Sequence, residues 1–178
     1  PSARVYSSFG ELEPFFIREK NWFTNLENKK VLVVSPFKQS IERQIPNLKD
    51  LWNKDMSSTQ FNVIKFPYSP FVSGKQEDKS YAHLLQRIQE QIKSEAFDVA
   101  IIGAGGYSIP IASFVKQIGK VGIHMGGALQ LLFGIKGKRW DNNHKFKDSE
   151  FYNSEKWIRP LPQDLPMNSF AVEGGCYW

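Results

Sequence analysis

The chain has 178 residues, of which 41% are hydrophobic and 23% are charged, as in a folded domain rather than a disordered segment. Its net charge of +5 is spread along the chain instead of being gathered on one helix or strand, so nucleic-acid binding is not expected. A single cysteine, Cys176, excludes an intramolecular disulfide and a cysteine-rich zinc site, and it fits a reducing, cytoplasmic location.

The sequence predicts no membrane-spanning segment, and its N-terminal part is predicted to be an irregular arm. No apolar run approaches the roughly 18 residues that cross a bilayer, so no transmembrane segment is expected. The first residue is a proline rather than an initiator methionine, and we expect the chain to continue from a longer one with other domains. Residues 1–28 are interpreted as an N-terminal arm with a short helix around Ser8–Arg18, and 29–178 as one α/β domain.

Buried strands and helices alternate in the first half of this domain. Val31–Val34 is a continuous apolar run, typical of a strand that is buried on both faces of a parallel sheet. A helix over 40–51 follows, broken or bent near Pro46, and Phe61–Phe66 is the next strand. Leucine and isoleucine recur on one stripe of 81–93, which predicts an amphipathic helix.

The second half continues the alternation and then loses it. Phe97–Ile102 is predicted as a third strand, and a helix follows from about Pro110 to Gln117. Val121–His124 is a fourth strand, followed by a short helix over 128–133. From about 134 glycine, lysine, asparagine and proline dominate, which predicts a loop-rich tail.

This order of elements predicts the fold class and the place of a site. Alternating strands and helices are typical of an α/β, Rossmann-like sandwich with a mainly parallel sheet, here with an irregular C-terminal tail. Right-handed crossovers bring the carboxyl ends of all strands to one edge, where ligands bind. The segments that follow the strands should therefore converge: Ser35–Phe37, Pro67–Pro70, Gly103–Tyr107 and His124–Gly127.

The glycine-rich turn after the third strand is the main candidate site. Glycines let the chain turn sharply and let a phosphate approach the backbone, and the following helix points free N–H groups at the same place. The spacing matches neither the dinucleotide fingerprint nor a P-loop, so a tight structural turn is the alternative. The predicted phosphate-binding residues are Gly103, Ala104, Gly105, Gly106, Tyr107 and Ser108, although the last two also suit a surface tyrosine and a helix cap.

A second glycine bend follows the fourth strand. Gly126 and Gly127 are predicted to contact the same phosphate-bearing ligand. His124, just before them, is the candidate catalytic base because the ordinary pKa of histidine lies near neutrality, the alternative being a packed polar residue. After the first strand, Ser35 and Phe37 are predicted to contact the ligand, with Phe37 stacking on a base or sugar unless it fills the core.

A basic cluster lies in the tail. Lys138 and Arg139 are predicted to bind the diphosphate of the ligand, although a solvated surface is the other interpretation of such a charge run. No Asp-x-Asp pair of the kind that holds Mg²⁺ or Mn²⁺ under a diphosphate is present, so a metal site is not expected.

Three segments resemble proteins found among polysaccharide-biosynthesis genes, a family associated with the glycosyltransferase GT-D fold. They are Lys30–Arg43 (KVLVVSPFKQSIER), Phe97–Trp140 and Val172–Trp178 (VEGGCYW), and the resemblance spans roughly 12–178. It implies transfer of a sugar from a nucleotide-sugar donor to a glycan acceptor. GT-D enzymes carry an Asp-x-Glu metal motif just after the strand that matches Val121–His124; because this chain has no carboxylate there, metal dependence does not carry over.

Three functional hypotheses follow. The first is a glycosyltransferase domain in which helix N-termini and Arg139 or Lys138 stabilise the leaving diphosphate in place of a metal. The second is a non-catalytic nucleotide- or glycan-binding module of a larger glycan-assembly protein. The third is a nucleotide hydrolase of the lysine-decarboxylase-like type, which shares the Gly-Gly-Tyr turn but has a threonine and a glutamate where this chain has Ser-Ile-Pro-Ile at 108–111.

Overall fold

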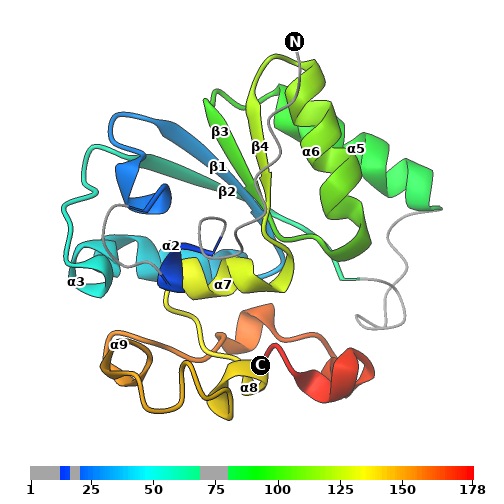
Figure 1. The fold of residues 1–178 in the computed structure, drawn as a ribbon. Helices are drawn as coiled ribbons and strands as arrows, with labels where there is room; N and C mark the ends of the chain where they lie inside the picture. The colour runs from blue at the N-terminus through cyan, green and yellow to red at the C-terminus, as the bar shows by residue number, and fades with distance from the viewer. Residues whose placement is uncertain (1–12, 17–20, 69–79) are drawn as a thin grey trace.

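The computed structural model describes residues 13–16, 21–68 and 80–178, with a four-stranded sheet at its centre (Figure 1). Its strands are β1 (Lys30–Ser35), β2 (Gln60–Lys65), β3 (Val99–Ile102) and β4 (Val121–His124). Neighbouring strands all run parallel, in the order β2-β1-β3-β4. The predicted α/β, Rossmann-like architecture with a parallel sheet is therefore confirmed.

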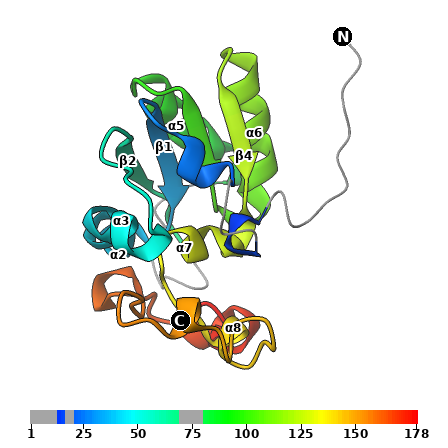
Figure 2. The same ribbon diagram turned by 60° about the vertical axis from the view of Figure 1, so that its left-hand side comes forward.

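Helices cover both faces of this sheet. They are α2 (Lys38–Gln44), α3 (Leu48–Trp52), α5 (Tyr81–Lys93), α6 (Ser108–Gln117) and α7 (Leu129–Leu132). Because successive strand residues point to opposite faces, Val31 and Val33 pack into one hydrophobic cluster, and Leu32 and Val34 into another. The first cluster contains residues of α2, α3 and α7, and the second contains residues of α5 and α6 (Figures 1 and 2).

The helices lie close to their predicted positions. The apolar stripe at 81–93 forms α5, which begins where the His83 N–H donates to the Ser80 Oγ at 3.2 Å. The predicted break near Pro46 is a 3-10 turn over Ile45–Asn47, which separates α2 from α3. The sequence pattern thus identified both the helices and the place where a proline interrupts them.

The order of the strands creates a switch point between β1 and β3. The chain adds β2 on one side of β1 and then adds β3 and β4 on the other side. Val34 of β1 pairs with Ile102 of β3, so the carboxyl ends of these two strands lie next to each other. In open parallel sheets, ligands bind in the crevice outside the carboxyl ends at such a point.

The tail from about residue 134 packs against α2 and α7, on their side away from the sheet (Figure 2). It contains two short helices, α8 (Lys138–Asp141) and α9 (Glu150–Asn153), joined by turns. Long regular elements are scarce, as predicted, but the tail is part of the core. Its buried aromatic residues belong to the same cluster as one face of the sheet: Trp140, Phe146, Phe151, Tyr152 and Trp157.

The described part of the N-terminal segment also packs into this cluster. Phe23 is fully buried, with its ring 5.5 Å from that of Trp52 and 5.6 Å from that of Phe133. Most of the predicted helix around Ser8–Arg18 lies outside the described residues, and within it the structure gives a 3-10 turn at Pro14–Phe16. Phe23 and Leu26, within the segment predicted as an arm, therefore belong to the core of the domain.

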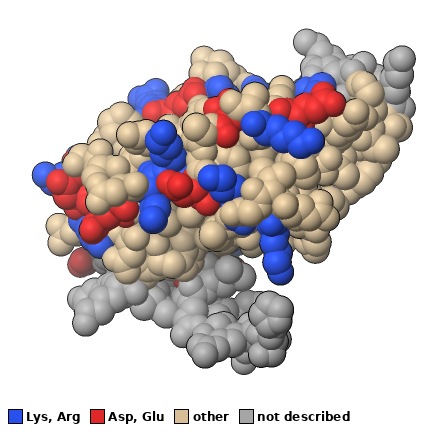
Figure 3. Space-filling view, turned by 90° about the horizontal axis from the view of Figure 1, so that it is seen from above, with Lys and Arg blue, Asp and Glu red and all other residues tan. Residues whose placement is uncertain are grey.

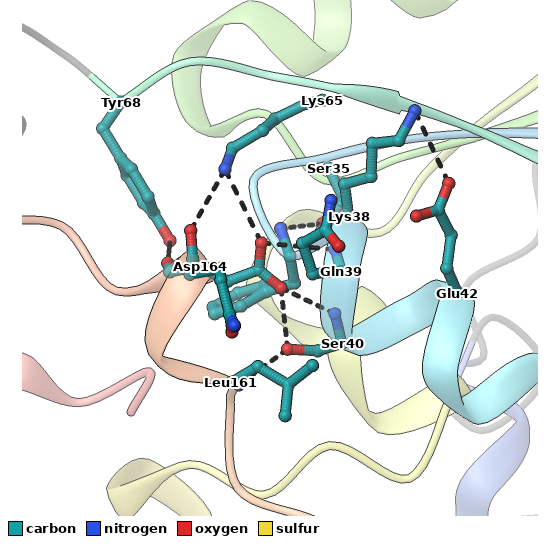
Figure 4. Close-up of polar contacts among 11 residues, drawn as sticks. Ser35, Lys38, Gln39, Ser40, Glu42, Lys65, Tyr68, Leu161 and Asp164 are labelled. Carbon is teal, nitrogen blue, oxygen red and sulfur yellow. Dashed lines mark hydrogen bonds and ion pairs between the residues drawn. The ribbon is translucent and has the colours of Figure 1, made fainter.

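Asp164 attaches the tail to the first turn of α2 (Figure 4). Its buried carboxylate accepts hydrogen bonds from the N–H and the Oγ of Ser40, both at 2.7 Å, and from the Gln39 N–H at 3.3 Å. The Ser40 Oγ in turn accepts the Leu161 N–H at 2.9 Å. Tyr68 donates its hydroxyl to the Asp164 carbonyl at 2.7 Å, and burial, with the nearby carboxylate, raises the pKa of Tyr68 well above its ordinary value, so this hydroxyl remains a donor.

Charged side chains of both signs are interspersed on the face seen in Figure 3. None of the helices among the described residues combines the length and the apolar character that are needed to cross a membrane.

Candidate functional site

A cavity of about 360 Å³ lies at the switch point between β1 and β3. This volume falls within the range of roughly 300–1,000 Å³ that is usual for small-molecule sites. Four stretches that lie far apart in the sequence contribute to its wall: Ser35–Phe37, Phe66–Tyr68, Gly103–Tyr107 and Gly126–Gly127. The predicted convergence of the loops is confirmed for these residues, but His124 and Met125 do not line the cavity. Ser69 and Pro70 of the predicted Pro67–Pro70 segment lie outside the described residues.

The first glycine bend touches the second. A Cβ on Gly103 would lie 2.7 Å from the carbonyl oxygen of Gly126, so only glycine allows the two backbones to approach so closely. Gly105 has a φ of +54°, and a Cβ on either Gly105 or Gly106 would meet nothing within 4 Å. These two glycines therefore expose their backbone to the cavity.

The amides of this bend are arranged as an anion site. Within the part of the chain that the structure describes, the N–H groups of Gly105 and Gly106 donate to no protein group. They lie in the 3-10 turn that leads into α6, a helix of ten residues. Free N–H groups and the helix dipole at such a position favour a negatively charged ligand.

Ser108 has a structural role rather than the predicted contact with the ligand. Its side chain is buried, and its Oγ accepts the Ala104 N–H at 2.8 Å, which closes the bend. Ser35 differs from Ser108 because it lines the cavity as predicted, although its buried Oγ also accepts the Phe37 N–H at 3.2 Å. Phe37 combines both proposed roles: it is buried in the core cluster, and it also lines the cavity.

The second glycine bend is covered by an aromatic ring. A Cβ on Gly127 would overlap the ring of Tyr177, which lies directly over this backbone. Gly126 has a φ of +56°, which favours glycine. Gly126 and Gly127 both line the cavity, and Gly127 also seats the ring of Tyr177, whereas the first bend is open. A phosphate contact at the second bend stays a prediction.

Aromatic side chains form much of the remaining wall. Tyr107 lies 5.2 Å from the ring of Phe66 and stacks on Tyr81, with ring centroids 4.1 Å apart and an interplanar angle of 19°. Trp178 meets Tyr68 edge to face at 5.7 Å. Such faces bind sugar rings and nucleobases. Tyr68 lies in the predicted Pro67–Pro70 segment, but sequence reasoning missed Phe66, Tyr177 and Trp178 as cavity residues, although the unusual VEGGCYW segment was a signal for the last two.

Two hydrogen-bond acceptors line the same cavity. Gln130 is 1% exposed, and its Nε2 donates to three carbonyl groups, whereas its buried Oε1 has no partner among the described residues. A buried polar atom of this kind calls for an explanation, and a ligand donor provides one. Glu173 is the one charged side chain among the described cavity-lining residues.

The position of Glu173 is set by its neighbours and by an unusual backbone. Its carboxylate forms an ion pair with Arg139 and accepts the Cys176 thiol at 3.4 Å. Glu173 has a φ of +46°, and Gly174 and Gly175 follow at +67° and +78°. A non-glycine residue in this region is strained and is often found at functional sites. The segment is thus shaped to hold a carboxylate at the cavity.

The predicted basic residues take different positions. Arg139 does not line the cavity but lies behind it, where its Nη1 donates to the Tyr177 hydroxyl at 3.0 Å. Lys138 lines a separate cavity. His124 is exposed and stands outside the first cavity, so the geometry does not support it as a base there. Among the residues in the described ranges, no group of three His, Cys, Asp or Glu side chains is placed to hold a metal ion.

Fold and cavity together define an α/β, Rossmann-like protein with a cavity at its switch point. Comparisons of the chain with protein-family models, with curated proteins and with solved structures gave no match.

The reactivity of the Cys176 thiol should depend on its hydrogen bond to Glu173. Burial and the hydrogen bond to Glu173 raise the pKa of Cys176, and Arg139 opposes this in part. Because the thiolate is the reactive form, we expect slow alkylation by iodoacetamide at pH 8, with the rate rising only above the ordinary thiol pKa. Replacing Glu173 by glutamine removes a carboxylate that raises this pKa and should accelerate alkylation at pH 8 several-fold. Mass spectrometry across pH 7–10 measures the rates.

The matched control for this measurement is Glu155→Gln, at an exposed position in the tail. It should leave the alkylation rate of Cys176 unchanged. An unchanged or slower rate in Glu173→Gln would contradict the contact between the carboxylate and the thiol.

Proposed function

We propose that the chain is a glycosyltransferase domain that binds a nucleotide-sugar in the switch-point cavity and transfers its sugar to a glycan acceptor. One observation carries the proposal: a single cavity combines open backbone N–H donors, the side chains of Gln130 and Glu173, and aromatic faces. These are the groups that match the phosphates, the hydroxyls and the rings of a nucleotide-sugar.

The diphosphate is assigned to the open glycine bend. The N–H groups of Gly105 and Gly106 supply donors, and α6 supplies the positive end of its dipole. Negative charge that develops on the leaving diphosphate is stabilised by the same groups, which need no reorganisation during the reaction. Tyr107, directly after the bend, supplies an aromatic face beside the phosphates.

The sugar hydroxyls are assigned to the acceptors of the cavity. Gln130 lines the cavity, and its buried Oε1 has no partner among the described residues, so we assign this oxygen as the acceptor for a ligand hydroxyl. The rings of Phe37 and Trp178, whose centroids are 6.1 Å apart, offer apolar faces to the carbon skeleton of a sugar.

Glu173 takes the role of the base in this proposal, in place of His124. Its carboxylate accepts the proton of the acceptor hydroxyl while the hydroxyl oxygen forms a bond to the anomeric carbon of the donor. The bond between that carbon and the diphosphate oxygen breaks, and the nucleoside diphosphate leaves. Arg139 orients the carboxylate through their ion pair. We assign this reaction to the cytoplasm.

Binding to the first bend is tested with Gly106→Ala. Because a Cβ there meets no protein atom and Gly106 is not at positive φ, the melting temperature should change by less than about 2 °C. The added methyl group occupies ligand space, so the affinity for the phosphate-bearing ligand should fall at least tenfold. Isothermal titration with a panel of nucleoside diphosphates and nucleotide-sugars measures this.

Ser113→Ala, at an exposed position of α6, is the matched control and should bind as the wild type does. The proposal fails if no member of the panel binds the wild-type chain. It also fails if Gly106→Ala binds with unchanged affinity.

A second candidate function is a nucleotide-sugar-binding module without turnover. It is favoured by one observation: Arg139, the predicted partner of the leaving diphosphate, is held by Glu173 and Tyr177 and does not line the cavity. Binding of a nucleotide-sugar with no transfer and no hydrolysis over long incubation, both with EDTA and with added Mg²⁺ or Mn²⁺, would favour this module over the transferase.

A further inference from the structure

A second cavity of about 390 Å³ lies next to the first. Its wall is formed by residues of the tail, namely Lys138, Asp141, Arg159, Pro160, Leu165 and Trp178. Trp178 lines both cavities and is the residue that they share. A ligand that occupies the second cavity therefore meets, across Trp178, a ligand that occupies the first.

The second cavity carries an excess of positive charge. Asp141 is engaged through both oxygens: Oδ2 pairs with Arg159 at 2.8 Å, and Oδ1 accepts the Tyr152 hydroxyl at 2.8 Å. Lys138, by contrast, has no carboxylate partner among the described residues, and its ammonium lies 4.9 Å from the ring centroid of Phe170. One cation thus remains free to bind an anionic group.

Apolar side chains in the same part of the tail are unusually exposed. Met167 is 77% exposed and Phe170 is 72% exposed, and Leu165, which lines the cavity, is 43% exposed. Of these, Leu165 lines the cavity together with Trp178, and the two provide apolar surface on which a sugar ring can pack.

We propose that the second cavity is the acceptor subsite, and that its ligand is an anionic saccharide with a carboxylate or a phosphate that pairs with Lys138. The proposal rests on the function given above, because it places the acceptor beside the donor, on the other side of Trp178. The saccharide ring packs on Trp178, and its hydroxyl is directed toward Glu173 in the first cavity. Carboxylate and phosphate share the chemistry that Lys138 recognises.

Titration of the full chain with three ligands tests this: a galacturonic acid oligosaccharide, glucose 1-phosphate and a neutral malto-oligosaccharide. We expect at least one anionic ligand to bind at least tenfold more tightly than the neutral one, with an affinity that falls as the salt concentration rises. Whichever binds shows whether the carboxylate or the phosphate is the natural group. Equal affinities for anionic and neutral ligands would overturn the proposal.

Lys138→Ala should reduce the affinity for the anionic ligand at least fivefold and leave nucleotide binding in the first cavity unchanged. Lys147→Ala, at another exposed lysine of the tail, is the matched control. Equal affinities in the two variants would overturn the assignment to Lys138. If the anionic saccharide binds through Lys138 but no nucleotide binds the first cavity, the saccharide site stands and the proposed transfer reaction fails.

Discussion

Replacing Asp164 by alanine should destabilise the protein by about 3 kcal/mol, a large part of the stability of an ordinary domain. The Asp164 side chain is fully buried and accepts three hydrogen bonds from the first turn of α2. Without it, the N–H groups of Gln39 and Ser40 lose their partner, and the tail loses a direct connection to the sheet domain.

Urea denaturation of Asp164→Ala and of the exposed Asp148→Ala control measures this effect. Asp164→Asn, which keeps one acceptor oxygen, should lie between the wild type and the alanine variant. Lys65 approaches the same carboxylate at 3.7 Å and is half exposed, so its own replacement should matter much less. A difference of less than about 0.5 kcal/mol between the two alanine variants would refute the anchoring role of Asp164.

The sheet and its helices could be predicted from the sequence because their signals are local. The apolar run Val31–Val34 contains residues for both faces of the sheet, and that pattern alone identifies a strand covered on two sides. The stripe of α5 likewise depends only on spacing along the chain. The position of the Gly103–Gly106 turn beside the cavity could also be predicted, because parallel topology brings the strand-to-helix turns to one edge of the sheet.

The roles of single side chains were harder to predict from the sequence. Whether the hydroxyl of Ser108 faces a ligand or its own backbone depends on the shape of one turn, and here it accepts the Ala104 N–H. Lys138 and Arg139 are neighbours in the sequence, but successive residues of a helix point about 100° apart. Within α8, Lys138 therefore lines the second cavity whereas Arg139 binds Tyr177 and Glu173, a difference that a charge run cannot reveal.

The packing of the tail was also hard to predict from the sequence. Phe151 and Trp157 meet edge to face at 5.1 Å in the core, yet nothing in their spacing follows a helical or a strand period. Their burial comes from contacts with distant parts of the chain, such as the 5.4 Å approach of Phe151 to Trp52. Glu173 reaches the first cavity in the same way, through the fold of a segment without periodic pattern.

Glu173→Gln should reduce the rate of sugar transfer at least about 100-fold, because the amide cannot accept the proton of the acceptor hydroxyl. It keeps the size of the side chain and an oxygen acceptor, so donor affinity should change only a few-fold. Transfer is measured as release of nucleoside diphosphate, with kcat and KM determined separately across pH. Glu155→Gln is the control here as well.

The results expected for Glu173→Gln differ according to whether Glu173 acts as a base or has only a structural role. Loss of the ion pair with Arg139 alone would loosen Tyr177, which contacts the same guanidinium, and would then weaken donor binding along with turnover. Loss of the base lowers kcat with little effect on KM. Glu173→Asp, which restores a carboxylate on a shorter side chain, should recover part of the rate. If Glu173→Gln transfers within threefold of the wild type, the proton goes elsewhere, and the strained turn at Glu173 serves only to close the cavity.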